Sequence, residues 1–306
     1  MIKKPSELNF TNKKMSMIVA GVPGVGKTTL ALSAPKPLLI DLDKGVSRVE
    51  TAYRGDVAEI TTYEELMKDL NGDLSGYETI VIDTGGKLLE LLKPVVIKDN
   101  VKNGQSDGTL SLKGYGAIKR KFGEFVNFVK QKDKNLIVVF HASEVQLNGG
   151  DTTGLRIRIE GSSKDEVWDD MDIGGFVEMR GNKRIISFQN CDRFYAKRTH
   201  GIRDVYEVPL LKGGNANTFV ADLFAEIKKN LNAEIAIFED YKKALTSKVF
   251  IDKCTKIEDL NKIYDKIKET KHALTSKEEL WILLNTRAKE LGAKYDKETN
   301  SFKNND

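Results

Sequence analysis

The sequence predicts an α/β fold in which a mostly parallel sheet is flanked by helices, carries an added β hairpin, and is followed by a small all-α C-terminal module. Apolar runs alternate with helix-like segments over the first two thirds of the 306 residues. Strands that are apolar on both faces need cover on both sides, which is typical of parallel sheets. From about residue 218 onward the pattern is helical. We therefore expect a core over residues 1–230 and a helical module over 231–306 that ends in a frayed tail.

The expected elements of the core follow one another in the order that a layered fold requires. Strands are predicted over 15–21, 36–43, 56–60, 77–84 and 135–143, and helices over 27–34, 61–70 and 115–132. The first helix ends before Pro35, and Thr62 with Glu65 forms a capping box for the second. Residues 172–191 contain two β runs around "RGNK", which predict a hairpin added to the sheet.

The C-terminal module is expected to consist of helices with a core of their own. Thr255 with Glu258, and Ser276 with Glu279, have the spacing of capping boxes, and Gly292 is placed to end the last helix. Lysines on these helices are nearly matched by acids, which favours a solvated face. The alternative is a docking module for a partner such as a single-stranded-DNA-binding protein.

Composition excludes several classes of protein. The first residues have no apolar segment of signal-peptide length, and no stretch approaches the ~18 apolar residues of a membrane span. Cys191 and Cys254 lie far apart without paired spacing, so neither a disulfide framework nor a zinc site is expected. We expect a cytoplasmic protein without membrane contact, in the host cytoplasm if a phage encodes it. The net charge of +4 permits nucleic-acid binding without requiring it.

One motif points to chemistry. The stretch "GVPGVGKTT" fits G-x-x-x-x-G-K-[ST] and lies between a predicted strand and a predicted helix. Glycines let successive backbone N–H groups face phosphate oxygens, Lys27 reaches the β- and γ-phosphates, and the Thr28 hydroxyl binds Mg²⁺. The residues expected to contact ATP are Gly21, Val22, Pro23, Gly24, Val25, Gly26, Lys27, Thr28 and Thr29. The alternative is a glycine-rich turn without a ligand.

Polar residues at the ends of three other strands complete the expected ATP and Mg²⁺ site. Asp83 ends an apolar strand, where it would hold Mg²⁺ through water. Asp41 and Asp43 lie two apart at the edge where α/β sheets bind ligands, so either is a candidate to position water for hydrolysis. His141 emerges at the same edge and is a candidate sensor of the γ-phosphate. The alternatives are capping or surface roles for the aspartates and a structural role for the histidine.

This succession of motifs resembles a known family. "GVPGVGKTT", "LLIDLD", "TIVIDT", "LIVVFHAS", a hairpin and "FYAKRTHG" follow one another as in the RecA-like P-loop core. More narrowly, residues 14–225 resemble the phage-type AAA_24 nucleotide-binding proteins, which include RecA-like single-strand annealing proteins of the Sak group.

The resemblance also implies roles for individual residues. Asp43 occupies the position of the family's water-activating glutamate, and its shorter side chain implies a slow ATPase. His141 takes the place of a sensor that is often Gln. Relatives carry a K-x-R pair that reaches the neighbouring subunit's nucleotide. Here Lys197 and Arg198 are adjacent and Arg193 lies upstream, so which of them would reach across stays open, as does a purely solvated strand end.

The resemblance places single-stranded DNA on two long loops, over residues 98–114 and 144–168. Both loops are rich in Gly, Ser and Asn, and loops longer than about 15 residues are usually functional or disordered. Cations on such loops can follow a phosphate backbone without reading sequence. The candidates are Lys98, Lys102, Lys113, Arg156, Arg158 and Lys164, and the alternative is two solvated loops.

The function expected from the sequence is that of an ATP-binding DNA recombination protein. It would bind single-stranded DNA and promote annealing or strand pairing as a homo-oligomer, either a ring or a filament, that ATP modulates. One alternative is a nucleotide switch or scaffold that recruits a protein partner without binding DNA. Another is a hexameric helicase-type motor.

Overall fold

The computed structural model describes residues 8–147, 152–159, 166–211, 215–269 and 274–304. The chain divides into two compact units. Residues 12–228 form one, here called the core unit, and residues 1–11 with 229–306 form the other, here called the C-terminal unit. Within the described residues, no helix has both the length and the apolar character that a membrane crossing requires.

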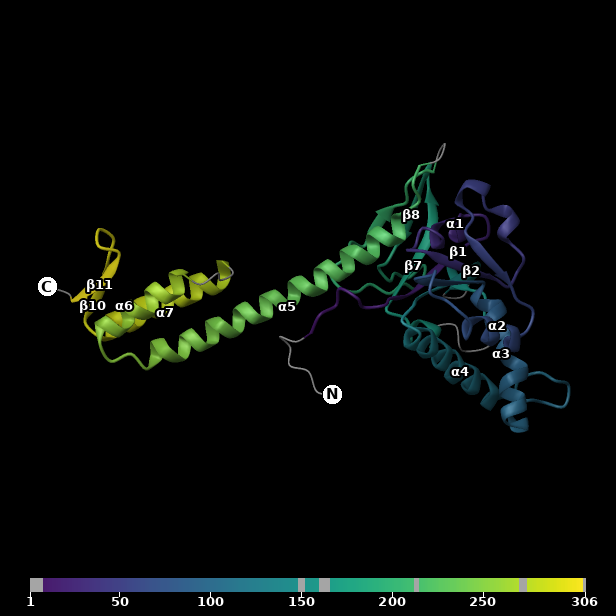
Figure 1. Ribbon diagram of the computed structural model, residues 1–306, viewed down its shortest axis with the longest axis horizontal. Coiled ribbons are helices and arrows are strands. Elements are labelled where there is room, and N and C mark those ends of the chain that lie inside the picture. The colour runs from purple at the N-terminus through teal and green to yellow at the C-terminus, as the bar shows by residue number, and fades with distance from the viewer. Residues whose placement is uncertain (1–7, 148–151, 160–165, 212–214, 270–273, 305–306) are drawn as a thin grey trace. The chain divides into compact units, whose positions relative to one another are not determined.

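The core unit is built on one sheet with the strand order β3-β2-β4-β5-β1-β7-β8-β9 (Figure 1). The mutually parallel strands are β1 (Ser16–Gly21), β2 (Pro37–Asp41), β3 (Asp56–Glu59), β4 (Thr79–Asp83), β5 (Asn135–Leu147) and β7 (Ile173–Arg180). Antiparallel strands β8 (Lys183–Ser187) and β9 (Val205–Glu207) extend one edge. All residues of β1 are buried, as expected for a strand between two parallel neighbours. The predicted α/β class is confirmed.

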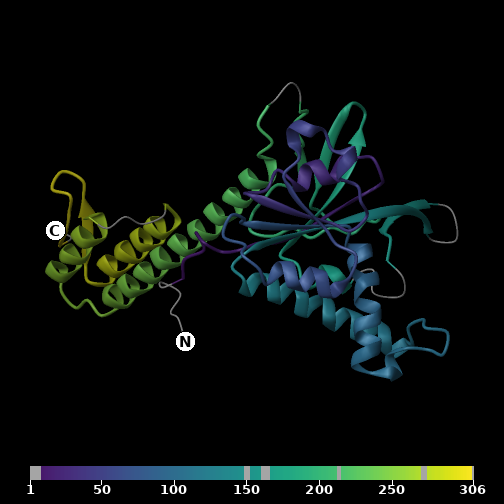
Figure 2. The same ribbon diagram turned by 45° about the vertical axis from the view of Figure 1, so that its right-hand side comes forward.

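Helices cover both faces of this sheet. Figure 2 shows α2 (Tyr63–Leu70), α3 (Gly85–Asp99) and α4 (Leu112–Gln131) on one face and α1 (Lys27–Ala31) on the other. Alternate strand residues such as Ile80 and Ile82 pack against α2, α3 and α4 in one apolar core. The predicted capping box of α2 is confirmed, because Thr62 Oγ1 accepts from the Glu65 N–H and the Glu65 carboxylate accepts from the Thr62 N–H.

Two hairpins extend the sheet, and only one of them was predicted. Strands β7 and β8 pair antiparallel around a two-residue turn in which Gly181 has φ 58°, which confirms the first hairpin. The second arises because β5 continues to Leu147 and pairs with β6 (Thr152–Ile157). The expectation of a loop over 144–168 was therefore wrong for 144–147 and 152–157, while 148–151 and 160–165 lie outside the described residues.

The expected loop over 98–114 is also shorter than predicted. Helix α3 extends to Asp99, a 3₁₀ turn spans Val101–Asn103, and α4 begins at Leu112. A β bridge between Gly104 and Leu110 closes the connection between them. This segment is therefore held by backbone hydrogen bonds and does not form an open loop.

The C-terminal unit contains helices, as expected, and a hairpin that was not. Helix α5 (Phe219–Asp252) begins in the core unit, and it is followed by α6 (Ile257–Glu269) and α7 (Leu274–Glu290). The helical module is confirmed, but its tail is not frayed: strands β10 (Ala293–Asp296) and β11 (Ser301–Asn304) pair antiparallel after α7. Phe302 packs into the apolar core of this unit, and its backbone N–H and C=O both bond to the Asn261 side chain.

The two expected capping boxes of the C-terminal unit were also wrong. Helix α6 begins after Lys256, one residue beyond Thr255, and Ser276 lies inside α7. Gly292 has φ 71° directly after α7, as its predicted place at the helix end requires.

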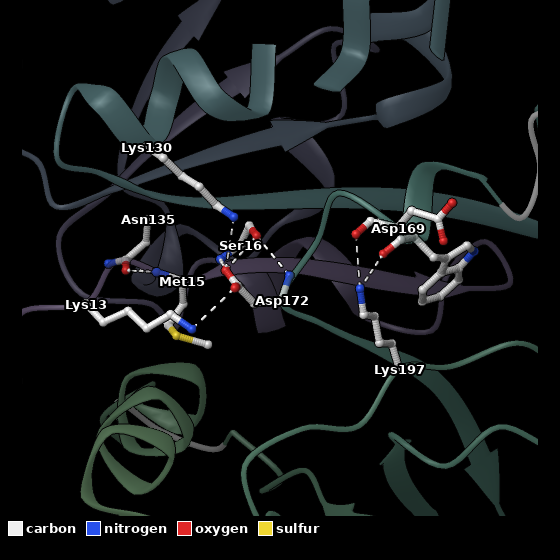
Figure 3. Close-up of polar contacts among 9 residues, drawn as sticks. Lys13, Met15, Ser16, Lys130, Asn135, Asp169, Asp172 and Lys197 are labelled. Atoms are coloured by element: carbon white, nitrogen blue, oxygen red, sulfur yellow. Dashed lines mark hydrogen bonds and ion pairs between the residues drawn. The ribbon is translucent and has the colours of Figure 1, made fainter. Parts of the chain in front are cut away.

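A polar cluster fixes the amino ends of the strands. We call Lys13, Ser16, Lys130, Asn135 and Asp172 the amino-end cluster (Figure 3). The Asp172 carboxylate accepts from the Ser16 N–H and from Ser16 Oγ, both at 2.8 Å, and pairs with Lys13 at 3.4 Å and Lys130 at 3.3 Å. Asn135 Oδ1 accepts from the Met15 N–H at 2.9 Å. These contacts join β1, β5, β7 and α4 at the edge opposite the "GVPGVGKTT" motif of residues 21–29, here called the phosphate loop.

Candidate nucleotide-binding site

The phosphate loop joins β1 to α1 at the carboxyl edge of the sheet. Gly24 has φ 79° and Gly26 has φ 86°, a region of backbone conformation that residues with a Cβ rarely adopt. Gly26 is also the N-cap of α1. The glycines of the motif are therefore required where the loop curls and enters the helix.

Lys27 is a buried cation at the end of this loop. Its residue is 4% exposed, and its Nζ donates to the Val22 carbonyl oxygen at 2.8 Å. Burial lowers the pKa of Lys27 to about 8; Asp83 and Asp43 oppose this shift, whereas Arg158 and Arg48 add to it. A nearby anion stabilises the charged form of an ammonium group that is buried beside other cations, and a polyphosphate supplies such an anion.

Thr28 and Asp83 form an oxygen pair beside Lys27. Thr28 Oγ1 donates to Asp83 Oδ2 at 2.6 Å. Asp83 ends β4 and is 5% exposed. Burial raises its pKa to about 6, with the Thr28 hydrogen bond opposing the shift and the charge of Asp43 adding to it. A hydroxyl and a carboxylate held together in this way fit the oxygen ligands that Mg²⁺ prefers.

The structure separates the two aspartates proposed to position water. Asp41 is the last residue of β2, and its carboxylate accepts from the N–H groups of Gly45 and Val46, both at 2.9 Å, so it holds the following turn. Asp43 lies beyond the strand and is close enough to affect the pKa of both Lys27 and Asp83. Asp41 also pairs in register with Asp83 and raises its pKa, but its carboxylate is occupied by the turn. Asp43 is therefore the better placed of the two to position water.

His141 lies between β1 and the Asp43 carboxylate. It pairs in register with Gly21, the first residue of the motif, and its Nε2 is 3.8 Å from Asp43 Oδ2. Burial lowers the pKa of His141, as does the charge of Lys27, while Asp43 opposes the shift. The imidazole is therefore neutral near pH 7. Its buried Nδ1 has no hydrogen-bond partner among the described residues.

Sequence reasoning missed three arginines of the site. Arg48 donates to Asp43 Oδ2 at 2.9 Å. Arg158, which was assigned to DNA, donates its backbone N–H to the His141 carbonyl at 2.7 Å, and its charge lowers the pKa of Lys27. The Arg184 guanidinium of β8 packs against Gly26. Arg48 follows Asp43 by only five residues, so its closeness in sequence could have indicated the contact. The other two arginines reach the site only through strand pairing.

The basic cluster after the hairpin makes contacts within its own chain. Lys197 Nζ donates to the carbonyl oxygens of Trp168 at 3.0 Å and Asp169 at 3.1 Å, at the end of the 3₁₀ turn Glu166–Trp168 (Figure 3). Arg193 pairs with Glu178 at 2.8 Å, and Arg198 pairs with Asp204. Lys197 therefore makes local contacts within one chain, and which of the three residues reaches a neighbouring subunit stays a prediction.

Only two of the six residues expected to bind DNA line a common cavity. Arg156 and Arg158 line a cavity of about 400 Å³ between α3, the start of α4 and the β5–β6 hairpin. Lys98 lies in the last turn of α3, Lys102 in the 3₁₀ turn and Lys113 in the first turn of α4, and none of these three lines that cavity. Lys164 lies outside the described residues.

Comparison with protein families finds a match to the AAA domain family AAA_24 over residues 13–200, which is more than half of the chain. Comparison with curated proteins finds no match. The matched range contains the phosphate loop, Asp83 and His141. A buried lysine, a hydroxyl–carboxylate pair and this family match agree on one kind of domain. The chain belongs to the AAA_24 family of AAA domains, which are nucleotide-binding domains of the P-loop ATPase type.

Proposed function

We propose that the chain binds Mg-ATP at the phosphate loop and hydrolyses it slowly. The observation that carries this proposal is the Thr28–Asp83 contact of 2.6 Å beside the buried Lys27. Mg²⁺ would neutralise charge on the phosphates when it is bound by Thr28 and Asp83. Lys27 offers its ammonium to the phosphate oxygens, exchanging the Val22 carbonyl for a charged acceptor.

Asp43 and His141 are the residues proposed to orient water. The Asp43 carboxylate reaches the site but also accepts from Arg48, so it must release or share this partner to accept a proton from water. The neutral His141 ring can hold a water molecule or a phosphate oxygen through Nε2. A carboxylate with a competing partner supports slow rather than fast turnover.

The first experiment measures Mg-ATP binding to the Lys27→Ala variant by calorimetry. Loss of a charge-assisted contact of about 3 kcal/mol lowers the affinity about a hundredfold. Lys132→Ala serves as the matched control, because Lys132 bonds to Asn71 at the end of α4 and not to the phosphate loop. Equal affinities in Lys27→Ala and wild type would overturn the site assignment.

We further propose that the cavity beside the β5–β6 hairpin binds single-stranded DNA and that the protein promotes annealing or strand pairing. Support comes from two arginines, Arg156 and Arg158, together with Lys93 and the ring of Tyr115, which line one cavity. Cations and an aromatic ring are the groups that hold a single strand without reading its sequence. The resemblance to RecA-like annealing proteins supports the same function.

The DNA site would respond to ATP through Arg158. This residue lines the DNA cavity, and its backbone bonds to His141 of the nucleotide site.

The proposed active form is a homo-oligomer in which Arg198 reaches the neighbouring nucleotide. Its ion pair with Asp204 is half-exposed on both sides, so it can be exchanged, whereas Lys197 is held by two carbonyls.

Fluorescence anisotropy of a labelled single strand across a salt series, with and without Mg-ATP, tests the DNA proposal. Removal of one phosphate contact in Arg156→Ala reduces the salt slope by about 0.7. Lys98→Ala, outside the cavity, is the matched control and leaves the slope unchanged. No binding of wild-type protein at low salt, with or without Mg-ATP, would reject the DNA function.

One observation favours a second candidate, a nucleotide switch that recruits a protein partner. Asn217 Nδ2 donates to the Thr29 carbonyl at 2.8 Å, and the Val220 and Ala221 N–H groups bond to Ser33. Helix α5 therefore begins on the helix of the phosphate loop, and it continues to Asp252. Hydrogen exchange along α5 in the full chain, with and without Mg-ATP, tests this candidate. ATP-dependent protection of α5 together with absent DNA binding would favour the switch.

A further inference from the structure

A small cavity adjoins the phosphate loop on the side away from the Mg²⁺ ligands. It measures about 90 Å³ and is lined by the first turn of α1, by Arg184 of β8, by residues 208, 209, 211 and 216–218, and by the start of α5. In the sheet, β5 and then β4 with Asp83 lie on one side of β1, while β7 and then β8 with Arg184 lie on the other. A nucleoside triphosphate whose terminal phosphates lie at Thr28 and Asp83 can extend its nucleoside past Gly26 and Thr29 into this cavity, because both residues line it.

Arg184 presents the face of its guanidinium group to the phosphate loop. A Cβ placed on Gly26 would lie 2.9 Å from Arg184 Cζ and 3.1 Å from both Nε and Nη2. Cζ is the nearest atom, and Nε and Nη2 are equally far. The Cβ position on Gly26 therefore lies above the plane of the guanidinium group and not beside its edge. One face of the planar group therefore packs on Gly26, and a ring in the cavity would stack on the opposite face.

The same guanidinium has no hydrogen-bond or ion-pair partner in the part of the chain that the structure describes. Its Nε–H is buried and donates to no acceptor among the described residues, and Arg184 takes part in none of their ion pairs. Nearby Arg180 and Arg193 are both paired with Glu178. A buried N–H without an acceptor is costly, so this position favours a ligand that can contact the guanidinium.

The remaining walls suit a flat ring with polar edges. Leu30, Val208 and Phe219 give apolar surface, and Asn217 is fixed by its bond to the Thr29 carbonyl, which leaves its Oδ1 available as an acceptor. Sites that hold whole cofactors have volumes of about 300–1,000 Å³, so a cavity of this size fits one ring system. A nucleobase combines a π face for the guanidinium with donors and acceptors along its edge.

We propose that this cavity is the nucleobase subsite and that Arg184 stacks on the base of the bound nucleoside triphosphate. The proposal rests on the proposed nucleotide-binding function and adds the group that distinguishes a nucleotide from a bare polyphosphate.

Calorimetry with two ligands, Mg-ATP and Mg-tripolyphosphate, tests the proposal on the full chain. Arg184→Ala lowers ATP affinity about tenfold, from loss of a cation–π contact, and leaves tripolyphosphate affinity within twofold. Arg184→Lys keeps the charge but loses the plane, and recovers only part of the ATP affinity. Lys183→Ala is the matched control, because its neighbouring side chain pairs with Glu207 and leaves both affinities unchanged.

Three outcomes have separate meanings. Unchanged ATP affinity in Arg184→Ala would overturn the subsite, and equal losses for both ligands would assign Arg184 to the phosphates instead. Wild-type protein that binds neither ligand would overturn the nucleotide-binding function itself, and the subsite with it. Retained tripolyphosphate binding in Arg184→Ala shows that the variant is folded.

Discussion

A buried aspartate, Asp83, and a half-buried one, Asp172, lie at opposite edges of one sheet and are held in different ways. Burial alone would raise the pKa of Asp172, but hydrogen bonds from Ser16 and the charges of Lys130 and Lys13 outweigh it and lower that pKa. Asp83 has one hydrogen bond, from Thr28, and its pKa rises to about 6. A carboxylate with several donors and cations around it is a structural group, whereas a buried one with a single donor is prepared for a ligand.

Removal of the satisfied carboxylate is expected to have the largest effect on stability. Asp172→Ala leaves the Ser16 donors and two lysines without their acceptor, at a cost of about 3 kcal/mol in the free energy of unfolding. Urea unfolding measures this loss, with Asp170→Ala as the control on the neighbouring segment. A loss below about 1 kcal/mol would remove the contrast between the two aspartates.

Removal of the unsatisfied carboxylate is expected to stabilise the protein. The native Asp83 carboxyl keeps its proton to about pH 6, while its ordinary pKa is 3.8, so stability falls as pH rises between these values. Asp83→Asn avoids this loss and gains about 2 kcal/mol above pH 6. Urea unfolding at pH 7.5 and pH 3.5 checks the sign. A gain of the same size at both pH values would exclude the ionisation of Asp83 as its cause.

The same pKa predicts how metal-dependent binding varies with pH. Mg²⁺ needs the Asp83 carboxylate, so its contribution to nucleotide affinity falls about tenfold between pH 7 and pH 5, which follows from a pKa of about 6. Calorimetry with and without Mg²⁺ at each pH measures the contribution. The Asp83→Asn series corrects for titration of the nucleotide itself. A contribution that stays constant to pH 5 would show that Asp83 ionises far below this value.

The smallest expected effect separates a local role of Lys197 from a role between subunits. Lys197→Met removes donors to the carbonyls of Trp168 and Asp169 and costs about 1 kcal/mol in the free energy of unfolding. Thermal unfolding measures this cost, and ATP turnover measured on the same variant stays unchanged. Lost turnover at unaltered stability would instead return Lys197 to the neighbouring subunit's site.

The parts of the fold and site that sequence predicted are those that local residues determine. The phosphate loop is contiguous, Asp83 and His141 follow runs of buried strand residues, and Thr62 caps its helix through a residue three positions away. Each feature depends on spacing along one segment. Such patterns are visible without knowledge of the tertiary structure.

The parts that sequence missed depend on partners far along the chain. The β5–β6 hairpin is rich in Gly and polar residues, and it forms a sheet because β5 is already held in the core. The C-terminal hairpin depends on Phe302 packing and on Asn261, 41 residues away. Arg184 reaches Gly26 only through the order of β1, β7 and β8. Propensity gives way to tertiary contact in all three cases.

The place of β1 in the sheet has a consequence for the synthesis of the protein. This strand comes first in the chain, yet its two neighbours are β5 and β7, and its pairing with β7 reaches Val177. A ribosome that adds about 5–20 residues per second leaves the strand of the phosphate loop first unpaired and then half-paired for about 8–30 s, while more than 150 residues emerge. Chaperones that shield apolar strands would therefore meet this segment on the nascent chain, and nucleotide can stabilise the core only after β7 has emerged.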